Sequence, residues 1–381
     1  EPLLMETEYE KPLVLVVDDD PTNLRILVSK LNREYRLGVA KSGTKALEYM
    51  GKQIPDLVLL DVMMPDMDGY ETIKIMRERG YVLPVVALTA HAMQSDKQRC
   101  LDAGMDAYLS KPFKQALLFD TIHSLLPEYY RVPEAQAGDP ARPSVPDAAS
   151  WAFLPPCFSL ETVIQTGLSP QQYPTILQSF ARNHAQDAAL FRHAVRTHDW
   201  ESLRERAHAL KGASANLGAL HLRDMARTLE LEAQSQLDKG YPNAALSTLQ
   251  GRPLAALLPE LEEALGEVLE AAAKLCPSDK ETKPAGGPSA IASKPTLDIA
   301  KLGTYYNDLV EALLQAAPGR IRIALGSLLV ICNADEYPLL HTLKMHVDNY
   351  DYEAALTVLE RIRPSLFSSS APSTEPSDAA Q

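Results

Sequence analysis

The sequence has few features of secreted, membrane-spanning or disulfide-bonded proteins. Its 381 residues include four cysteines, and no two of them form a Cys-x-x-Cys pair. We therefore predict reduced thiols and a cytoplasmic protein. The longest apolar runs, at 13–17 and 323–332, fall short of the ~18–20 residues that cross a bilayer. The chain begins with Glu1 and shows no basic segment followed by an apolar one, so no signal peptide is predicted.

Basic residues are scarce relative to acidic ones, 37 against 50, and the formal net charge is −13. This balance argues against a general nucleic-acid binder. The 18 glycines are outnumbered by 28 prolines, and half of the prolines fall in three stretches without hydrophobic periodicity. Such stretches are typical of linkers and tails. We predict a first domain at 11–126, a linker at 127–157, a second domain at 158–274, a linker at 275–296, a third segment at 297–363 and a disordered tail at 364–381.

The first domain alternates between short apolar runs and helical patterns. Runs such as Leu13–Val17 and Leu57–Leu60 are apolar throughout, which is typical of strands buried on both faces of a parallel sheet. Strict alternation of strand and helix predicts an α/β doubly wound, five-stranded parallel sheet of the flavodoxin-like type. Ligands bind such sheets at the carboxyl ends of the strands.

Acidic side chains follow two of these strands. Asp18, Asp19 and Asp20 come directly after the first, and Asp61 ends the third. Because the carboxyl ends of parallel strands meet at one edge, these carboxylates should lie together and attract a hard divalent cation such as Mg²⁺. Thr89 after the fourth strand and Lys111 after the fifth suit a phosphoryl group bound at that cation.

Four motifs carry a close resemblance to the receiver domain of two-component response regulators. They are Val16-Val-Asp-Asp-Asp-Pro21, Asp61-Val-Met-Met-Pro-Asp-Met-Asp-Gly69, Ala87-Leu-Thr-Ala90 and Tyr108-Leu-Ser-Lys-Pro112. The resemblance implies that Asp61 is the phosphoacceptor and that the Lys111–Pro112 bond is cis. It also implies that Asp18, Asp19, Asp61 and the backbone carbonyl of Met63 hold Mg²⁺, that Lys111 and Thr89 contact the phosphoryl oxygens, and that Tyr108 is an aromatic switch following Thr89. Asp20, Asp66 and Asp68 are interpreted as turn and cap residues.

The second domain has helical patterns throughout, which predicts a helical bundle. We expect helices at 160–165, 173–197, 200–217, 220–237 and 254–274. Within the third, an apolar or small stripe faces a core, and His208 lies one residue off that stripe. Lys211 and Gly212 follow at three and four residues and share its face. A glycine there costs about 1 kcal/mol of helix stability relative to alanine, but it lets a partner approach the imidazole closely.

Residues 208–219, His-Ala-Leu-Lys-Gly-Ala-Ser-Ala-Asn-Leu-Gly-Ala, resemble the motif of histidine-phosphotransfer (HPt) domains. The resemblance implies that His208 is phosphorylated and that Lys211 and Gly212 support it. The other histidines of this domain lack such surroundings, and we interpret them as structural or solvated: His184, His193, His198 and His221.

The third segment is again predicted to be all-helical, with Leu302, Tyr306, Leu309 and Leu313 on one stripe. Leu340-His-Thr-Leu-Lys344 repeats part of the second domain's motif, but bulky residues follow where glycine and small residues would be needed. We therefore do not expect phosphorylation at His341. The segment weakly resembles a C-terminal helical part of some hybrid sensor kinases, which suggests a docking or dimer contact.

Together the domains predict a phosphorelay protein. By resemblance to hybrid sensor kinases, the phosphoryl group passes from an upstream sensor histidine kinase to Asp61, then to His208, then to a downstream response regulator. Two alternatives stay open: the C-terminal part of a hybrid sensor histidine kinase whose ATP-dependent core is missing, and a non-phosphorylated docking scaffold. The sequence has no P-loop or glycine-rich ATP lid, so enzymatic activity of this chain by itself is uncertain. The missing initiator methionine suggests a fragment or a processed chain, and Met5 is an equally good start. Transfer within one chain and between chains are both possible.

Overall fold

The computed structural model describes residues 11–89, 94–126, 148–239, 254–275, 299–332 and 337–367. The chain divides into two compact units, residues 1–286 and 287–381. Most of the predicted linker residues, and the tail beyond Phe367, lie outside the described ranges.

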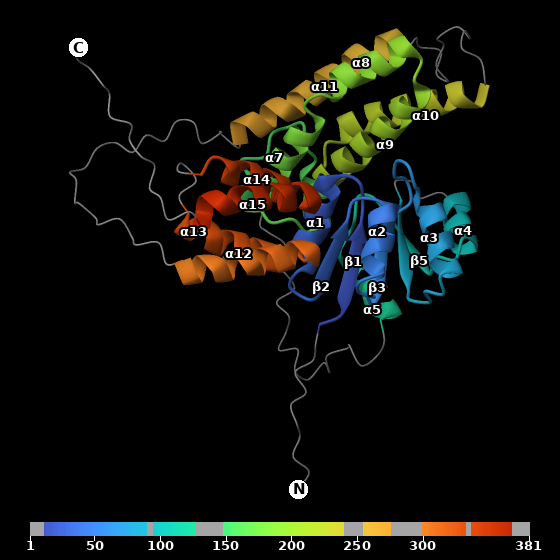
Figure 1. The fold of residues 1–381 in the computed structure, drawn as a ribbon. Coiled ribbons are helices and arrows are strands. Elements are labelled where there is room, and N and C mark those ends of the chain that lie inside the picture. The colour runs from blue at the N-terminus through green and yellow to red at the C-terminus, as the bar shows by residue number, and fades with distance from the viewer. Residues whose placement is uncertain are drawn as a thin grey trace, which may run out of the picture. The chain divides into compact units, whose positions relative to one another are not determined.

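The first domain is a five-stranded parallel sheet in the order β2-β1-β3-β4-β5, which confirms the predicted fold class (Figure 1). The strands β1, β3 and β4 are buried at every residue because helices cover both faces of the sheet. The strands are β1 (Leu13–Val17), β2 (Arg36–Ala40), β3 (Leu57–Asp61), β4 (Val85–Thr89) and β5 (Ala107–Ser110). The helices are α1 (Pro21–Leu31), α2 (Gly43–Met50), α3 (Gly69–Glu78), α4 (Gln94–Asp102) and α5 (Gln115–Leu125).

The acidic residues that were predicted as turn and cap residues have these roles. Asp20 is the N-cap of α1, where its Oδ1 accepts a hydrogen bond from the Thr22 N–H at 2.6 Å. Asp68 caps α3 in the same way, and Asp66 adopts a left-handed turn conformation with φ 65°. These caps satisfy N–H groups that have no partner inside a helix. They fix where α1 and α3 begin, directly after the ends of β1 and β3.

The second domain is a helical bundle, as predicted. Its long helices α9 and α10 pack against each other (Figure 1) and are joined by a short turn at Gly218, which has a positive φ of 78°. The predicted stripe of α9 is buried from Trp200 to Leu217. The helices are α6 (Leu160–Thr166), α7 (Tyr173–His184), α8 (Asp187–Thr197), α9 (Trp200–Leu217), α10 (Leu220–Lys239) and α11 (Leu254–Leu275), after a short 3-10 turn η2 (Ala148–Trp151).

One predicted helix is wrong. Residues 173–197 form two helices, because α7 ends at His184 and α8 begins at Asp187. Apolar periodicity continues across the break, from Ile176 and Phe180 to Phe191, so hydrophobic spacing gave no sign of it. The side chains of His184 and Asp187 are hydrogen-bonded across the break at 2.7 Å.

The two domains of the first unit share a core. Helix α1 of the first domain packs against α7 and α9 of the second. Ile26 on α1 is fully buried and belongs to the same hydrophobic cluster as Phe180 and Leu210. Trp151, which falls within the predicted linker, is buried in that cluster too. The first domain therefore contributes an apolar side chain to the core of the second.

The second unit contains four described helices. Leu302, Tyr306, Leu309 and Leu313 of the first are buried, which confirms that stripe. His341 and Lys344 are exposed. No helix within the described residues is both long and apolar enough to cross a membrane. The helices are α12 (Ile299–Leu314), α13 (Pro318–Ile331), α14 (Leu339–Asp348) and α15 (Tyr352–Phe367), the last of which includes Pro364 and ends beyond the predicted boundary at 363.

Candidate functional site

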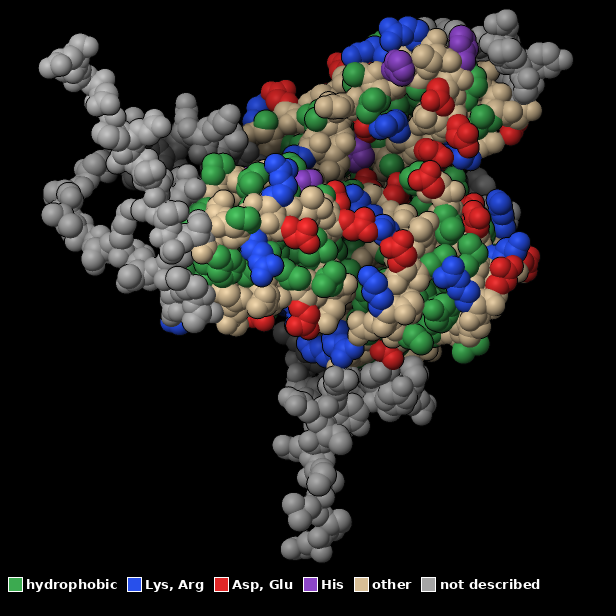
Figure 2. All heavy atoms as spheres, in the orientation of Figure 1, with side chains coloured by type: hydrophobic (Ala, Val, Ile, Leu, Met, Phe, Trp, Pro, Cys, Tyr) green, Lys and Arg blue, Asp and Glu red, His purple; other side chains and the backbone are tan. Residues whose placement is uncertain are grey.

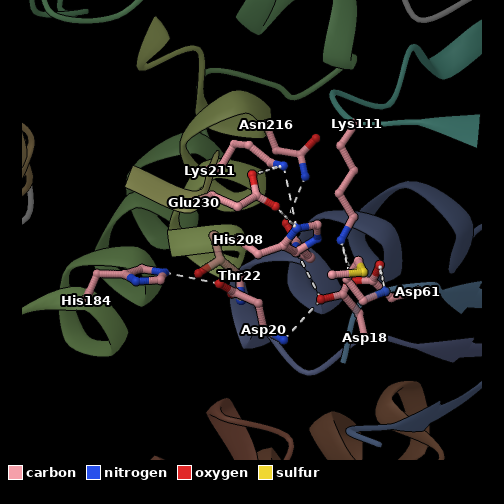
Figure 3. A network of polar contacts seen from close by, with 12 residues as sticks. Asp18, Asp20, Thr22, Asp61, Lys111, His184, His208, Lys211, Asn216 and Glu230 are labelled. Atoms are coloured by element: carbon pink, nitrogen blue, oxygen red, sulfur yellow. Dashed lines mark hydrogen bonds and ion pairs between the residues drawn. The ribbon is translucent and has the colours of Figure 1, made fainter. Parts of the chain in front are cut away.

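The carboxylates at the ends of β1 and β3 converge, as their positions in the sequence predicted. Asp18 and Asp61 are buried, Asp19 is partly buried, and one ligand oxygen from each lies within 4.8 Å of the others. Lys111 enters this cluster from the end of β5 (Figure 3). Its Nζ lies 2.8 Å from Asp18 Oδ2 and 2.6 Å from Asp61 Oδ2. Two of the three carboxylates therefore share one lysine.

The electrostatics of this cluster favour a further cation. Burial raises the pKa of Asp61 to about 7, although the nearby Lys111 charge opposes this rise. Burial also raises the pKa of Asp19, and the charges of Asp18 and Asp61 raise it further. Carboxylates that repel one another and lose hydration are stabilised by a divalent ion with oxygen preference. The donor set at this sheet edge fits Mg²⁺.

The remaining predicted residues of the first domain line the same edge. Thr89 ends β4, and its carbonyl accepts a hydrogen bond from the Lys111 N–H at 2.7 Å. The Lys111–Pro112 bond is cis. The Met63 N–H donates to Asp61 Oδ1 at 3.3 Å. Tyr108 lies on β5, where the Lys97 ammonium is 5.3 Å from the centre of its ring.

His208 is held by a residue that sequence analysis did not select. Its Nδ1 lies 2.6 Å from Oε1 of Glu230, which comes from the neighbouring helix α10 (Figure 3). Glu230 Oε2 accepts a hydrogen bond from Lys211 Nζ at 2.5 Å. The sequence predicted that Lys211 would support His208. In the structure Lys211 Nζ lies 3.5 Å from His208 Nδ1, and both side chains bind the same carboxylate. His208 is only 4% exposed.

The environment of His208 defines its tautomer. A carboxylate paired with a lysine accepts hydrogen bonds, so Nδ1 carries the proton and donates it to Glu230. Nε2 then carries the lone pair, and it is buried with no hydrogen-bond partner among the described residues. Burial lowers the pKa of His208 to about 4, with the nearby lysine charges adding to this effect against Glu230. His208 is therefore a neutral imidazole with a free Nε2 near neutral pH.

His208 faces the carboxylate cluster of the first domain. A cavity of about 250 Å³ separates the two domains here and is lined by both Asp19 and His208. Met63 and Arg204 also line it. Arg204 precedes His208 by one helical turn, and its buried Nε has no hydrogen-bond partner in the described part of the chain. The Asp19 carboxylate, the His208 imidazole and the Arg204 guanidinium therefore line one cavity.

Gly212 lies where α9 closely approaches the first domain, and a Cβ at this position would still fit at ordinary contact distances. A Cβ built on Gly212 would lie 3.4 Å from Cδ of Lys111 and 3.7 Å from Nδ2 of Asn23. Lys111 and Asn23 both belong to the first domain. Helix α9 thus lies directly against the edge of the sheet that carries the carboxylates.

Asn216 connects the two domains through a chain of amide hydrogen bonds. Asn23 Nδ2 donates to Asp18 Oδ1 at 3.0 Å, and Asn216 Nδ2 donates to Asn23 Oδ1 at 2.8 Å. Asn216 Oδ1 accepts from the Phe113 N–H at 3.2 Å. Because the Asp18 carboxylate can only accept, the orientation of each amide in the chain is determined.

His184 makes a second contact between the domains. Its Nδ1 lies 2.7 Å from Asp187 Oδ2, and its Nε2 lies 3.1 Å from Asp20 Oδ2 across the interface (Figure 3). Burial alone would lower the pKa of His184, but the hydrogen bonds and charges of the two carboxylates raise it to about 10. His184 is thus buried between two hydrogen-bonded carboxylates, as its interpretation as a structural residue suggests, and one of the two lies in the other domain. His193 and His221 are exposed, and His198 caps the end of α8.

Sequence reasoning missed Glu230, Asn216 and Asn23. Glu230 follows His208 by 22 residues and meets it only because α9 and α10 form a hairpin. Asn216 did carry a signal, since a polar amide one residue before the end of a buried helix requires a partner. Figure 2 shows acidic and basic side chains interspersed on the visible face. The strong local charge in the first domain is the buried carboxylate cluster.

Comparisons with known proteins match both domains. Residues 14–123 match the response regulator receiver domain, and residues 175–272 match the Hpt domain. The sensor histidine kinase RcsC of Salmonella typhimurium is 45% identical over 111 residues, which cover 29% of this chain and 12% of that protein. The histidine-protein kinase BarA of Escherichia coli is 38% identical over 120 residues, with 30% and 12% covered. The chain thus matches about an eighth of the length of these relatives.

Among solved structures, the receiver domain of the sensor histidine kinase PA1611 from Pseudomonas aeruginosa is 36% identical. The match covers 30% of this chain and 97% of that one, with a TM-score of 0.29. The sheet order and the two family matches agree on the organisation of the first unit. The chain therefore carries a response regulator receiver domain followed by an Hpt domain, the module pair of phosphorelay signalling.

Proposed function

We propose that Asp61 accepts a phosphoryl group from a phosphohistidine and that His208 receives it from Asp61. The observation that supports this proposal is the cavity lined both by Asp19, which belongs to the carboxylate cluster, and by His208, whose Nε2 has no hydrogen-bond partner among the described residues. A nucleophile and its electrophile must share such a space for in-line transfer.

A Mg²⁺ ion fits the first half of this reaction. The carboxylates of Asp18, Asp19 and Asp61 would hold it, together with the backbone carbonyl of Met63. When bound, it supplies charge neutralisation for the phosphoryl oxygens. Lys111 already contacts Asp61 and is placed to bind a phosphoryl oxygen there. Thr89 is the hydroxyl we assign to another oxygen, and Tyr108 is the aromatic ring that would follow its movement.

The transfer to His208 balances without a further reactant. The Nε2 lone pair attacks phosphorus, a P–N bond forms, and the P–O bond to Asp61 breaks. Asp61 regains its carboxylate with the electron pair of that bond. The Nδ1 proton stays on the ring in its hydrogen bond with Glu230. The Glu230 carboxylate offsets the positive charge that develops on the imidazole, in the way an acid orients and stabilises a catalytic histidine.

The partners follow from these chemistries. The donor to Asp61 would be the phosphohistidine of an upstream sensor histidine kinase, and the acceptor from His208 would be the aspartate of a separate response regulator. The chain would then act as the C-terminal part of a hybrid sensor kinase or as an independent relay protein. Both readings use the same two sites. Incubation with ATP and Mg²⁺ alone tests for a kinase core, and incorporation of label would reveal one.

Phosphoryl uptake tests the proposal directly. Radiolabelled acetyl phosphate is supplied to the wild-type chain and to the variants Asp61→Asn and His208→Gln. We expect acid-labile, base-stable label on the wild type, base-labile label only on His208→Gln, and no label on Asp61→Asn. If the wild-type chain takes up no label, the docking scaffold is the better description.

A further inference from the structure

We infer that His184 and Asn216 select this chain's own receiver domain, so that the phosphoryl group passes between Asp61 and His208 within one chain. This inference rests on the proposed function. It adds two specificity-determining positions to the residues that take part in transfer, His184 outside the motif at 208–219 and Asn216 within it. Neither side chain contacts the reacting atoms, so both are positioning residues.

The first position, His184, contacts Asp20, the residue directly before α1 of the receiver. His184 is buried between two carboxylates, Asp187 from its own domain and Asp20 from the receiver. Asp20 is 5% exposed, so its carboxylate has left water and needs a positive partner at this interface. A receiver with a basic residue at this position would be repelled, and one with an apolar residue would leave the second ring nitrogen without a partner.

The second position, Asn216, binds backbone and side-chain groups of the receiver near Lys111. Asn216 is fully buried, and its amide spans from Asn23 on α1 to the Phe113 N–H after the cis Lys111–Pro112 bond. It therefore contacts the receiver at two places, on α1 and directly after the Lys111–Pro112 bond. Donors and acceptors alternate along this series of hydrogen bonds, because the Asp18 carboxylate can only accept and so determines the orientation of the Asn23 amide. A receiver without an amide at position 23 would leave Asn216 unsatisfied.

Apolar contact holds the same surface together. Ile26 on α1 is fully buried in the cluster that also contains Phe180 and Leu210 of the Hpt domain. The interface thus combines a buried apolar side chain, a buried charge pair and a buried series of amide hydrogen bonds. These features are found together on the receiver that is covalently joined to this Hpt domain. A tether of this kind gives the receiver an effective concentration in the millimolar range, far above that of a separate chain.

Mixing variants of the full chain distinguishes transfer within a chain from transfer between chains. A His208→Gln chain carrying label on Asp61 is mixed with an Asp61→Asn chain, so that label can reach His208 only between chains. We expect wild-type transfer to be independent of protein concentration. We expect transfer in the mixture to rise with concentration and to be at least roughly 10-fold slower at micromolar protein. Equal rates, or a wild-type rate that rises with concentration, would overturn transfer within one chain.

Variants of the contacts test the two positions. His184→Gln and Asn216→Asp are expected to slow wild-type transfer to His208 by at least roughly 10-fold, with unchanged uptake of acetyl phosphate by Asp61. His193→Gln is the matched control, because His193 is exposed on α8. Asp20→Asn removes the charge pair from the receiver side while keeping an N-cap residue.

A double variant of Asp20 and His184 tests whether the single variants act through the contact between these two residues or through folding. The double variant Asp20→Asn with His184→Gln should be no slower than the slower single variant, since both remove the same interaction. Additive slowing, or no effect of either single variant, would overturn the role of His184. Unchanged transfer by Asn216→Asp would overturn that of Asn216. In each case phosphohistidine on the wild type would leave the proposed function standing, whereas its complete absence would reject that function first.

Discussion

At the scale of single residues, Gly212 connects helix stability with access to the receiver. Alanine at this position would place its Cβ in ordinary contact with Lys111 and would stabilise α9 by about 1 kcal/mol. A leucine would overlap Lys111 and Asn23. The position therefore separates the folding of the Hpt domain from its docking.

We predict that Gly212→Ala retains phosphoryl transfer and raises the melting temperature, whereas Gly212→Leu loses transfer but keeps its helix content. Labelled acetyl phosphate and far-ultraviolet circular dichroism measure the two properties. Gly266→Leu on α11 is the matched control, because a Cβ there meets nothing within 4 Å. Normal transfer by Gly212→Leu would contradict the docking geometry.

Arg204 carries the second residue-scale prediction. Its Nη1 donates to Gln234 at 3.3 Å, its Nε has no partner among the described residues, and it lines the cavity beside His208. Arg204→Gln should slow transfer from Asp61 to His208 by roughly 10-fold or more, since it removes a cation from the path of an anionic group. Arg206→Gln, on the exposed face of α9, should have little effect. Equal rates for the two variants would exclude a role for Arg204 in transfer.

At the scale of helices, two histidines on neighbouring helices differ in charge near neutral pH, since His184 is positive and His208 is neutral. The pKa of His184 is raised to about 10 from an ordinary value of 6.5, and that of His208 is lowered to about 4. Between pH 6.5 and 10 the folded chain holds a proton on His184 that the unfolded chain releases, so this stabilisation falls as pH rises. Between pH 4 and 6.5 the unfolded chain holds a proton that His208 in the fold lacks, so stability falls as pH falls.

We therefore predict that these two groups together give the first unit its greatest stability near pH 6.5. Nuclear magnetic resonance of the ring protons should show His184 charged and His208 neutral throughout pH 5 to 9. The His184→Gln and His208→Gln variants assign the two signals. A His208 signal that titrates near 6.5 would mean that the docked arrangement is not the one populated in solution.

The same scale shows what the sequence predicts and what it does not. Strand and helix order in the receiver follow from apolar runs between cap residues, and the convergence of Asp18, Asp61 and Lys111 follows from sheet topology. The break after His184 does not, since apolar spacing continues through it. Glu230 does not either, because its contact with His208 depends on how two helices pack. Local pattern determines elements, whereas partners between elements depend on tertiary contact.

At the scale of the whole chain, we expect Mg²⁺ to be required for phosphoryl uptake but not for folding. The carboxylate cluster already holds Lys111, so the fold has a cation there without Mg²⁺. We predict that chelation by EDTA abolishes uptake of acetyl phosphate while circular dichroism stays unchanged. Added Mg²⁺ should restore uptake, and added K⁺ should not. Uptake that continues in EDTA would argue against Asp18, Asp19 and Asp61 as a metal site.

The burial of His208 also limits when a second receiver can take the phosphoryl group. With its own receiver docked, the imidazole is 4% exposed, so a second receiver has no route to Nε2. Under the proposed function, the receiver that delivers the phosphoryl group and the receiver that accepts it from His208 bind the same surface, so they cannot bind at the same time. Export of the phosphoryl group cannot then proceed faster than the tethered receiver dissociates. The strength of that intramolecular contact thus sets an upper limit on the turnover of the entire pathway.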